Sequence, residues 1–331
     1  MNVCIYADPH VTKYIGGDIE RRQSHIIETF RELYSSSADI YICLGDFFHS
    51  SRIESRDVKY ISDLASIISK KTYILTGNHD RSSKNDSLIN LLESMNPQYI
   101  TSVDKYIRID DSLLVSHGYL EEALASPLVE GCKYLFTHED YADIQMNTHG
   151  RKSTTGHKIP QFMRVFNGHI HLSSLSTPLI NVGSVAPVAY GELRTYEYPK
   201  YYILHTEDGS YDDHKVTTST VLWDMTTSEY EEFCSQRDQY TGDYRIRVHY
   251  DSDKPSDPPV SAVGNVTCEY VKTLAVSPSE EGQSPRVSAT VSRTISVKEY
   301  VQRYVDKVPP DLVDRWKKIL DEMFLQVGGT K

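Results

Sequence analysis

The chain has 331 residues, of which 39% are hydrophobic and 24% are charged. This apolar content is enough for a buried core and excludes a wholly disordered chain, and the length favours one large domain with a smaller appendage. Lys and Arg together number 35 against 46 Asp and Glu, and the net charge of −11 excludes a general coat for nucleic acid, so any contact with nucleic acid would have to be local.

The amino-terminal part alternates predicted strands with predicted helices. Short apolar runs predict buried strands at 2–7, 39–44 and 72–76, and apolar residues at helical spacing predict helices at 19–34 and 58–68. This order of elements is typical of βαβ units and of a largely parallel sheet.

Further short strands are predicted in the same domain. The runs 105–109 and 112–116 flank Asp110-Asp111 and predict a hairpin. Additional strands are predicted at 133–137, 164–167, 178–182 and 200–205. Several of the predicted strands end in Asp, Asn or His. Because ligands of open α/β sheets gather at the carboxyl ends of the strands, we expect these polar residues to form one site.

Beyond about residue 206 the composition shifts toward Thr, Ser and Tyr. One alternating strand is predicted at 244–250, and two polar segments rich in proline and serine, 251–259 and 277–285, predict linkers. Apolar stripes at helical spacing then predict two amphipathic segments, over 297–308 and 312–323. These helices would either pack on this chain or dock on a partner.

The cysteine content and the first residues indicate the compartment. The five cysteines are scattered and form no CxxC pair, which argues against a disulfide framework and against a thiolate zinc site. The amino-terminal residues lack the basic start and apolar run of a signal peptide, and no segment approaches the ~18 uninterrupted apolar residues of a membrane span. We therefore expect a cytoplasmic protein that is not bound to a membrane.

Five short motifs carry polar side chains that can bind metal. They are Asp8-Pro9-His10, Gly45-Asp46, Gly77-Asn78-His79-Asp80, His138 and Gly168-His169-Ile170-His171. Carboxylate, imidazole and amide groups without sulfur suit manganese or iron better than magnesium or zinc. Two divalent ions would bring four positive charges, which two aspartates, a bound hydroxide and a phosphodiester would neutralise, so the charge balance is compatible with a phosphate ester as substrate.

In this order and at these spacings, the motifs resemble the signature of calcineurin-like metallophosphoesterases over about residues 1–205. The resemblance implies an α/β fold in which a β-sandwich core is flanked by helices, giving four α/β/β/α layers. Within it, segment 45–52 (Gly-Asp-Phe-Phe-His-Ser-Ser-Arg) resembles the second motif of SbcD-type nucleases. Segments 181–184 (Asn-Val-Gly-Ser) and 190–192 (Tyr-Gly-Glu) resemble the part of that family that follows the last histidine motif.

The likeness to SbcD-type nucleases, and to the phage recombination-endonuclease subunits of this group, implies an organisation and a set of partners. We expect a nuclease domain at 1–205, a small α+β capping and DNA-recognition domain at 206–276, a flexible linker at 277–293 and a partner-binding helix pair at 294–331. The implied partners are DNA, an SbcC-type ATPase that binds the C-terminal helices, and a second copy of this chain, so that a homodimer would form part of a heterotetramer.

The resemblance also implies the metal ligands. The first ion would be bound by Asp8, His10, Asp46 and His171. The second would be bound by Asp46, Asn78, His138 and His169. His117 competes with His138 for its position, because the sequence around His138 is less distinctive. We expect the two ions to be Mn²⁺, with Mg²⁺ or Fe²⁺ as alternatives.

Three further residues have implied roles beside the ions. His79 would act on the transition state by donating a proton or hydrogen bond toward the scissile phosphate, and Asp80 would orient it, as carboxylates behind a histidine commonly do. His49 would either face the substrate or pack behind the ligands.

Basic residues lie near the motifs and are candidates for phosphate contacts. They include Arg52, Arg81, Arg151 and Lys152. If the motifs converge, these side chains would give an acidic protein a local surface for a phosphate backbone. The alternative is that they are ordinary solvated residues of surface loops.

The sequence therefore predicts a two-metal DNA nuclease subunit with exonuclease and single-strand endonuclease activity. It would work with the ATPase in DNA end processing, recombination and repair, and because no segment resembles a P-loop, the partner would use the ATP. The alternative is a metallophosphatase or phosphodiesterase that acts on a small nucleotide or phosphomonoester. A metal-free adaptor is disfavoured because every ligand position holds a competent residue.

Overall fold

The computed structural model describes residues 1–13, 19–52, 54, 57–81, 87–146, 148, 150, 152–153, 156–240, 242–251, 255 and 265–272. The chain divides into a unit Met1–Ala275 and a unit Val276–Lys331, and every described residue belongs to the first unit. The linker predicted at 277–293 and the helix pair predicted at 294–331 lie outside the described residues.

The first sheet has six strands in the order β12-β11-β1-β2-β3-β4. They are β1 (Asn2–Tyr6), β2 (Ile40–Cys43), β3 (Thr72–Leu75), β4 (Ile100–Val103), β11 (Lys200–His205) and β12 (Ser210–Lys215). Strands β1 to β4 run parallel, and β11 pairs antiparallel with β1. The connections between the parallel strands contain α1 (Ile19–Tyr34), α2 (Asp57–Ile67) and α3 (Leu88–Met95), so the predicted βαβ units are present.

The second sheet also has six strands, in the order β5-β6-β7-β8-β10-β9. They are β5 (Tyr106–Ile109), β6 (Ser112–Val115), β7 (Tyr134–Thr137), β8 (Arg164–Asn167), β9 (Ser174–Ser176) and β10 (Leu179–Asn181). Strands β6, β7, β8 and β10 run parallel, and β5 forms the predicted hairpin with β6. The short helix α4 (Leu120–Leu124) and a 3₁₀ turn at Pro127–Val129 follow β6.

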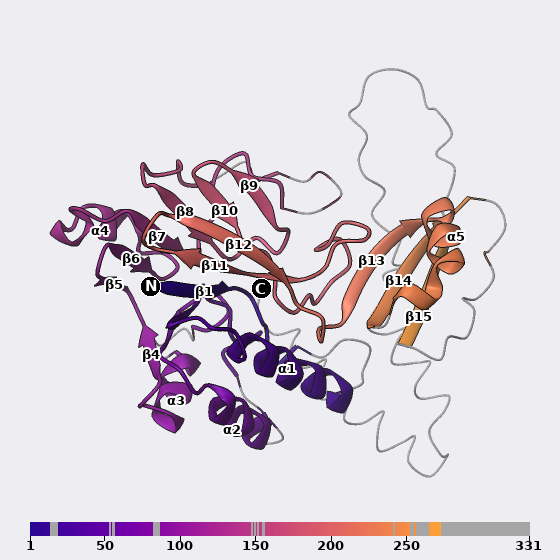
Figure 1. Cartoon of the computed structure of the whole chain (residues 1–331), viewed down its shortest axis with the longest axis horizontal. Helices are drawn as coiled ribbons and strands as arrows, with labels where there is room; N and C mark the ends of the chain where they lie inside the picture. Colours follow the sequence, from indigo (N-terminus) through magenta and orange to yellow (C-terminus); the bar gives the residue numbers. More distant parts are fainter. Residues whose placement is uncertain are drawn as a thin grey trace, which may run out of the picture. The chain divides into compact units, whose positions relative to one another are not determined.

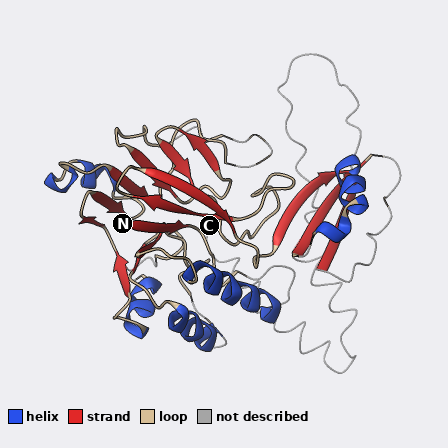
Figure 2. Cartoon of the chain, in the orientation of Figure 1, coloured by secondary structure: helices blue, strands red, loops and turns tan. Residues whose placement is uncertain are grey.

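The two sheets stack face to face, and α1, α2 and α3 cover the outer face of the first sheet (Figures 1 and 2). Successive side chains of a strand point to opposite faces, which sorts the residues of β1 between two layers. Cys4 and Tyr6 share a core with Phe30 of α1, whereas Val3 and Ile5 belong to the core between the sheets. A third core, which includes residues of α4, covers the outer face of the second sheet. These layers confirm the predicted α/β fold.

A third sheet follows, with three parallel strands. They are β13 (Val221–Thr226), β14 (Asp243–Tyr250) and β15 (Asn265–Lys272). Helix α5 (Thr227–Ser235) begins at a capping box between Thr226 and Glu229, and it packs on the sheet through Trp223, Phe233 and Tyr244. The strand predicted at 244–250 is β14. The boundary expected at residue 206 falls in the turn between β11 and β12, because β12 still pairs with β11 in the first sheet.

Helix α1 connects the first sheet to the third. Arg21 of this helix forms an ion pair with Asp243 at the start of β14, and His25 Nδ1 lies 2.7 Å from the hydroxyl of Thr220. The same hydroxyl donates to Asp243 over 3.0 Å. These contacts attach the third sheet to a helix whose other face packs on β1.

Candidate active site

The predicted ligands follow strands of both sheets, at the edge where the carboxyl ends of these strands meet. Asp8 follows β1, Asp46 follows β2, Asn78 follows β3, His138 follows β7, and His169 follows β8. Backbone bonds hold the loops together: the N–H of Asp8 donates to the carbonyl of Gly45, and the N–H of His10 donates to that of Asp46. The N–H of His169 donates to Asp8 Oδ1 over 3.2 Å, which connects the two sheets.

Glycines of the motifs allow the loops to approach this closely. A Cβ atom on Gly77 would lie 2.1 Å from Asp46 Oδ1, and one on Gly45 would lie 2.6 Å from His138 Nδ1. Any other residue would therefore displace a ligand. The presence of glycine in these motifs has a steric cause.

Four of the ligands adopt left-handed backbone conformations. The φ angles are 52° at Asp8, 43° at His10, 48° at Asp46 and 66° at His169. Such angles cost free energy for residues with a side chain, and they cluster at functional sites where surrounding contacts hold them. The backbone strain thus falls on the residues that the sequence predicts as ligands.

Asp8, His10 and His171 form the first group, with ligand atoms that lie within 4.8 Å of one another. The Nε2 atoms of His10 and His171 face each other across 3.0 Å. Nδ1 of His171 lies 2.7 Å from Oε1 of Glu192, so this nitrogen carries a proton that it donates to the carboxylate, and Nε2 is the nitrogen that faces His10. Asp8 Oδ2 is buried and has no hydrogen-bond partner among the described residues.

Asp46, His138 and His169 form the second group, again with ligand atoms within 4.8 Å. His138 Nε2 lies 3.3 Å from Asp46 Oδ2 and 3.1 Å from Asn78 Oδ1, and His169 Nδ1 lies 3.0 Å from the same amide oxygen. Asp46 Oδ2 is also 3.9 Å from His10 Nε2, so this oxygen lies between the two groups. All seven predicted ligands are thus brought together.

The donors of both groups fit divalent metal ions. A buried carboxylate oxygen without a hydrogen-bond partner is unfavourable unless a cation lies against it, and the Nε2 atoms of His10 and His171 converge on the same place as this carboxylate. Oxygen and imidazole donors without sulfur are the set that such ions prefer. The shared position of Asp46 matches the bridging role that the resemblance implies for it.

Burial and neighbouring charges shift the pKa values of three ligands in the metal-free protein. Burial opposes the charge on His138, but the adjacent Asp46 outweighs it and raises the pKa of His138 to about 9. Burial also opposes the charge on His171, but Glu192 raises its pKa to about 9. Burial raises the pKa of Asp8 to about 6, although His138 and His171 counteract it.

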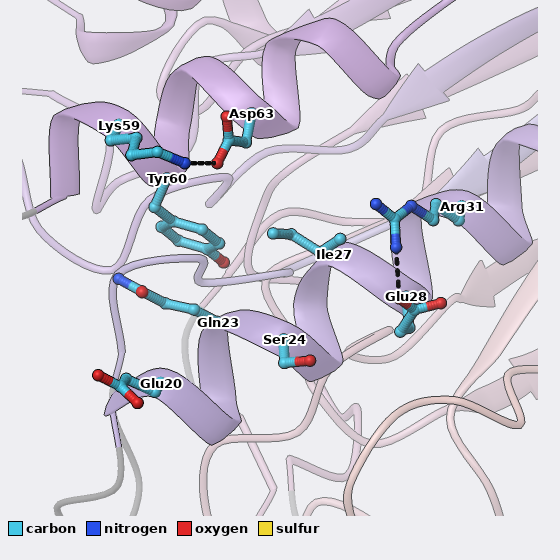
Figure 3. Close-up of a pocket in the computed structure, with 9 residues that line it drawn as sticks. All are labelled: Glu20, Gln23, Ser24, Ile27, Glu28, Arg31, Lys59, Tyr60 and Asp63. Carbon is cyan, nitrogen blue, oxygen red and sulfur yellow. Dashed lines mark hydrogen bonds and ion pairs between the residues drawn. The ribbon is translucent and has the colours of Figure 1, made fainter.

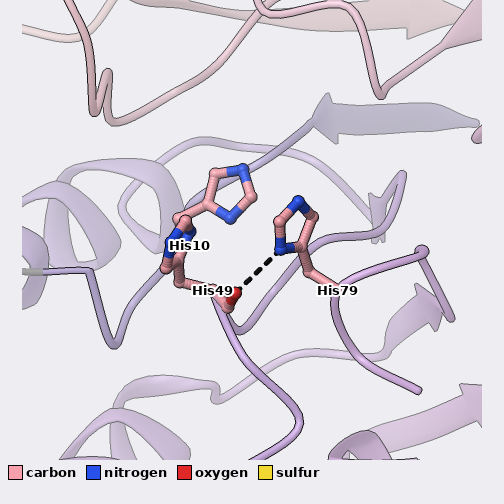
Figure 4. A group of neighbouring side chains, drawn as sticks. All are labelled: His10, His49 and His79. Atoms are coloured by element: carbon pink, nitrogen blue, oxygen red, sulfur yellow. Dashed lines mark hydrogen bonds between the residues drawn. The ribbon is translucent and has the colours of Figure 1, made fainter. Parts of the chain in front are cut away.

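His79 lies beside Asp46 and is open to solvent. Its side chain is 39% exposed, and Nε2 lies 3.9 Å from Asp46 Oδ2. Its ring stacks on that of His49 at 5.1 Å between centroids, and its Nδ1 lies 2.8 Å from the carbonyl oxygen of His49 (Figure 4). His10 meets both rings edge-on. His49 thus holds His79 through both its backbone and its ring.

The predicted contact between Asp80 and the His79 ring is wrong. Both oxygens of Asp80 accept backbone hydrogen bonds instead: Oδ1 accepts from Phe48 over 2.8 Å, and Oδ2 accepts from Gly77 over 2.9 Å and from Phe47 over 3.3 Å. The carboxylate is buried and ties the loop after β3 to the loop after β2. It therefore positions Asp46 and the backbone of His79, while the His49 carbonyl orients the ring.

His138, and not His117, lies in the second group. His117 Nδ1 is 2.9 Å from the backbone oxygen of His138 and 3.4 Å from Glu139, and its ring stacks on His169 at 5.8 Å. His117 therefore packs behind the ligands. Asp140 is a neighbour that the sequence did not indicate, with Oδ1 3.3 Å from His169 Nε2.

Glu192 is the functional residue that sequence reasoning missed, although its Tyr-Gly-Glu segment resembles the nuclease family. It lies 21 positions after His171 in the sequence, and only the loop after β10 brings it back to that side chain. In the sequence, the likeness of the Tyr-Gly-Glu segment to the nuclease family was the signal that could have identified Glu192.

Arg81, one of the predicted phosphate contacts, lies apart from the predicted ligands. The guanidinium of Arg81 donates to the backbone oxygen of Asp104 and lies 4.7 Å from the centroid of the Tyr119 ring, in a hollow that none of the predicted ligands lines. Arg52 and Lys152 are exposed, and Arg151 lies outside the described residues.

Two hollows on the described part of the chain differ in whether predicted site residues line them. The first, of about 250 Å³, is lined by Met146, His169, Ile170, His171 and residues 189–192. A larger one, of about 400 Å³, lies between α1 and α2 and is lined by polar side chains such as Glu20, Arg31 and Lys59 (Figure 3). It contains none of the predicted site residues.

Among the described helices, none has the length and hydrophobicity needed to cross a membrane.

Comparison with known proteins identifies the family of this chain. Residues 1–174 match the sequence model described as calcineurin-like phosphoesterase. Similar solved structures include an archaeal phosphodiesterase (18% identity, 65% of this chain and 99% of that chain, TM-score 0.35) and the protein TT1561 of Thermus thermophilus (12%, 65% and 98%, TM-score 0.41). A further one is the nuclease MPE of Pseudomonas putida (17%, 60% and 83%, TM-score 0.31). The comparison with curated proteins gave no match. With its family model covering more than half of its length, the chain belongs to the calcineurin-like phosphoesterases, which hydrolyse phosphate esters with divalent metal ions.

Proposed function

We propose that the protein is a two-metal-dependent DNA nuclease subunit that hydrolyses phosphodiester bonds as an exonuclease and single-strand endonuclease. The observation that carries this proposal is the position of Asp46 Oδ2 between two ligand groups, with the exposed His79 3.9 Å from it. This arrangement suits an in-line displacement at a phosphate, because a nucleophile, two ions and a proton donor would all meet there.

The residues around the ions have separable tasks. Two divalent ions, when bound, supply an activated water and neutralise the charge of the attacking and leaving oxygens. Asp8, Asp46 and the five other predicted ligands would hold them. His79 donates from Nδ1 to the His49 carbonyl and so turns Nε2 toward the substrate. As an imidazolium, it donates from Nε2 to the phosphate or to the leaving oxygen.

DNA is favoured over a small ester because the segments that resemble SbcD-type nucleases contribute to the site itself. His49, from segment 45–52, holds His79. The hydroxyl of Ser184, from segment 181–184, donates to the backbone oxygen of Asp8 over 2.8 Å, and Glu192, from segment 190–192, binds His171. Each of these three residues contacts a metal ligand or His79. The likeness to SbcD-type nucleases therefore extends to the candidate active site and is not confined to positions that stabilise the fold.

The remaining parts of the proposal concern metal and partners. The donor set favours Mn²⁺, with Mg²⁺ or Fe²⁺ as alternatives. An SbcC-type ATPase would bind residues 294–331, two copies of this chain would form a homodimer in the heterotetramer, and the complex would process DNA ends in the cytoplasm. These expectations rest on the sequence resemblance, and residues 294–331 lie outside the described residues.

Cleavage of labelled linear DNA tests the proposal. Single- and double-stranded substrates are incubated with Mn²⁺ and wild type, His79→Ser or His214→Ser, with p-nitrophenyl phosphate in parallel. His214 is an exposed histidine of β12 and serves as the matched control. We expect the His79 variant alone to lose DNA cleavage. Turnover of the small ester without any DNA cleavage would refute the nuclease proposal and favour a phosphatase or small-nucleotide phosphodiesterase.

A further inference from the structure

The hollow beside the metal ligands has one wall that is formed by a residue without a role in the proposed hydrolysis. Tyr190 lines this hollow together with His169 and His171. It is half-buried and lies two residues before Glu192, the partner of His171. A substrate that reaches the ligands through this hollow would pass the Tyr190 ring.

Arg247 of β14 covers that ring. Its guanidinium carbon lies 4.1 Å from the centroid of Tyr190, the closest of the cation–aromatic contacts among the described residues. Burial alternates along β14: Ile246 and Val248 are buried in the core of the third sheet, whereas Arg247 points to the other face. The alternating strand noted in the sequence therefore presents an arginine to the Tyr190 ring, which itself lines the hollow.

Two carboxylates fix the guanidinium in this position. Arg247 pairs with Asp224 of β13 and with Glu269 of β15 in the strand register. Its Nε and Nη2 lie 3.4 Å from Glu269 Oε2, and its Nε lies 4.0 Å from Asp224 Oδ1. Nη1 has no hydrogen-bond partner among the described residues, and the side chain is 33% exposed. A guanidinium stacked on an aromatic ring keeps its in-plane N–H groups available for a phosphate.

We propose that Arg247, held over Tyr190, binds a phosphate that neighbours the scissile one in a polynucleotide chain. This inference rests on the proposed function and narrows its substrate: a chain with a second phosphate makes this contact, and a phosphomonoester or simple diester does not. Asp224 and Glu269 together outweigh the single positive charge of Arg247 at long range, so its contact with a phosphate is local and directed. That is how an acidic protein can bind a phosphate backbone without a broad basic surface.

The test compares two diesters on the same protein. Wild type, Arg247→Gln and Arg247→Lys are assayed with Mn²⁺ on a labelled single-stranded oligonucleotide and on bis(p-nitrophenyl) phosphate, which has a single phosphate. We expect kcat/KM of the Gln variant for the oligonucleotide to fall about ten- to a hundredfold relative to that for the small diester, mainly through KM, because one charge-assisted hydrogen bond is lost. The slope of log KM against log salt should decrease by about 0.7, the effect of one phosphate contact on a single strand.

The Lys variant retains the charge and should retain the salt slope while it loses part of the affinity, because an ammonium cannot replace the planar fork. Arg31→Gln is the matched control, since Arg31 also pairs with a glutamate but lies on α1. Turnover of the small diester shows that each variant is folded and contains metal.

Two outcomes would overturn the inference. Equal losses on both diesters would show that Arg247 acts through Tyr190 on the ligands, and an unchanged KM for the oligonucleotide would show that it does not contact the substrate. Wild type that hydrolyses the small diester but no DNA would instead refute the proposed function.

Discussion

The carboxylate of Glu192 holds His171 from behind: Oε1 lies 2.7 Å from Nδ1 of the imidazole, and Oε2 accepts a hydrogen bond from the backbone N–H of Val188 over 2.8 Å. The glutamate is thus fixed by its own loop and fixes the tautomer of His171. Such a partner sets both the orientation of a ligand histidine and its basicity.

We therefore expect Glu192→Gln to weaken metal binding at the group of Asp8, His10 and His171 by about ten- to a hundredfold. The amide can still accept from Nδ1 but carries no charge to support the ligand. Titration with Mn²⁺, followed by the paramagnetic signal of the free ion, measures the change. Glu197→Gln is the control, because the Glu197 side chain pairs with the exposed Arg194 and with no other described residue. Two ions bound with wild-type affinity in both variants would contradict the prediction.

Gly77→Ala should disrupt the same centre by a steric route. The new Cβ would lie 2.1 Å from Asp46 Oδ1 and 2.4 Å from its backbone nitrogen, and backbone atoms cannot swing aside as the end of a flexible side chain can. We expect a loss of about 1–3 kcal/mol in the free energy of unfolding, with weaker binding of both ions. Urea unfolding of the metal-free protein measures the first effect.

Gly118→Ala separates crowding from backbone strain. Gly118 has a φ of +82°, and among the described residues no atom beyond its own chain neighbours lies within 4 Å of the Cβ it would acquire. The alanine there should cost about 1–2 kcal/mol from its backbone conformation alone and leave metal binding unchanged. If the two variants bound Mn²⁺ equally well, the close approach at Gly77 would not matter for the site.

The ligand set was predictable from the sequence because each motif stands directly after an apolar run. Asp8, Asp46 and Asn78 follow parallel strands of one sheet, and the carboxyl ends of parallel strands share an edge. His138 and His169 follow strands of the other sheet; the strand ends predicted that they share one site with the first three, and the family resemblance assigned them to the second ion. Strand position alone could not have told how the two sheets stack.

Other parts of the structure left no comparable signal. Strand β12 has the sequence Ser-Tyr-Asp-Asp-His-Lys and is mostly exposed, so its pairing with β11 owes nothing to an apolar pattern. The contact of Arg247 with Tyr190 joins positions 57 apart in different layers. The family resemblance implies that Asp80 orients the adjacent His79, whereas its carboxylate accepts from the backbone N–H groups of Phe47 and Phe48 on a different loop.

Metal affinity should rise steeply with pH. The pKa of His138 and that of His171 are both raised to about 9, against burial, by Asp46 and by Glu192 respectively, so both rings are protonated in the metal-free protein at pH 7. A metal ion needs the neutral ring, and each group must release a proton to bind. We expect the affinity of each group to increase about tenfold per pH unit up to about pH 9 and then to level off. Mn²⁺ titrations at pH 6.5, 7.5 and 8.5 under nitrogen measure this; affinities independent of pH would show that the rings are already neutral.

Counting bound ions decides between the two histidines that competed for the second group. His138 Nε2 lies 3.3 Å from Asp46 Oδ2 and 3.1 Å from Asn78 Oδ1, whereas His117 contacts the backbone oxygen of His138 from behind. We expect His138→Ala to bind one Mn²⁺ instead of two, because the second group of Asp46, His138 and His169 loses one of its two imidazoles. His117→Ala should still bind two, with an affinity lowered by no more than about tenfold, as for other residues that support a ligand. Elemental analysis after gel filtration gives the ratio of metal to protein, and two ions in the His138 variant with one in the His117 variant would reverse the assignment.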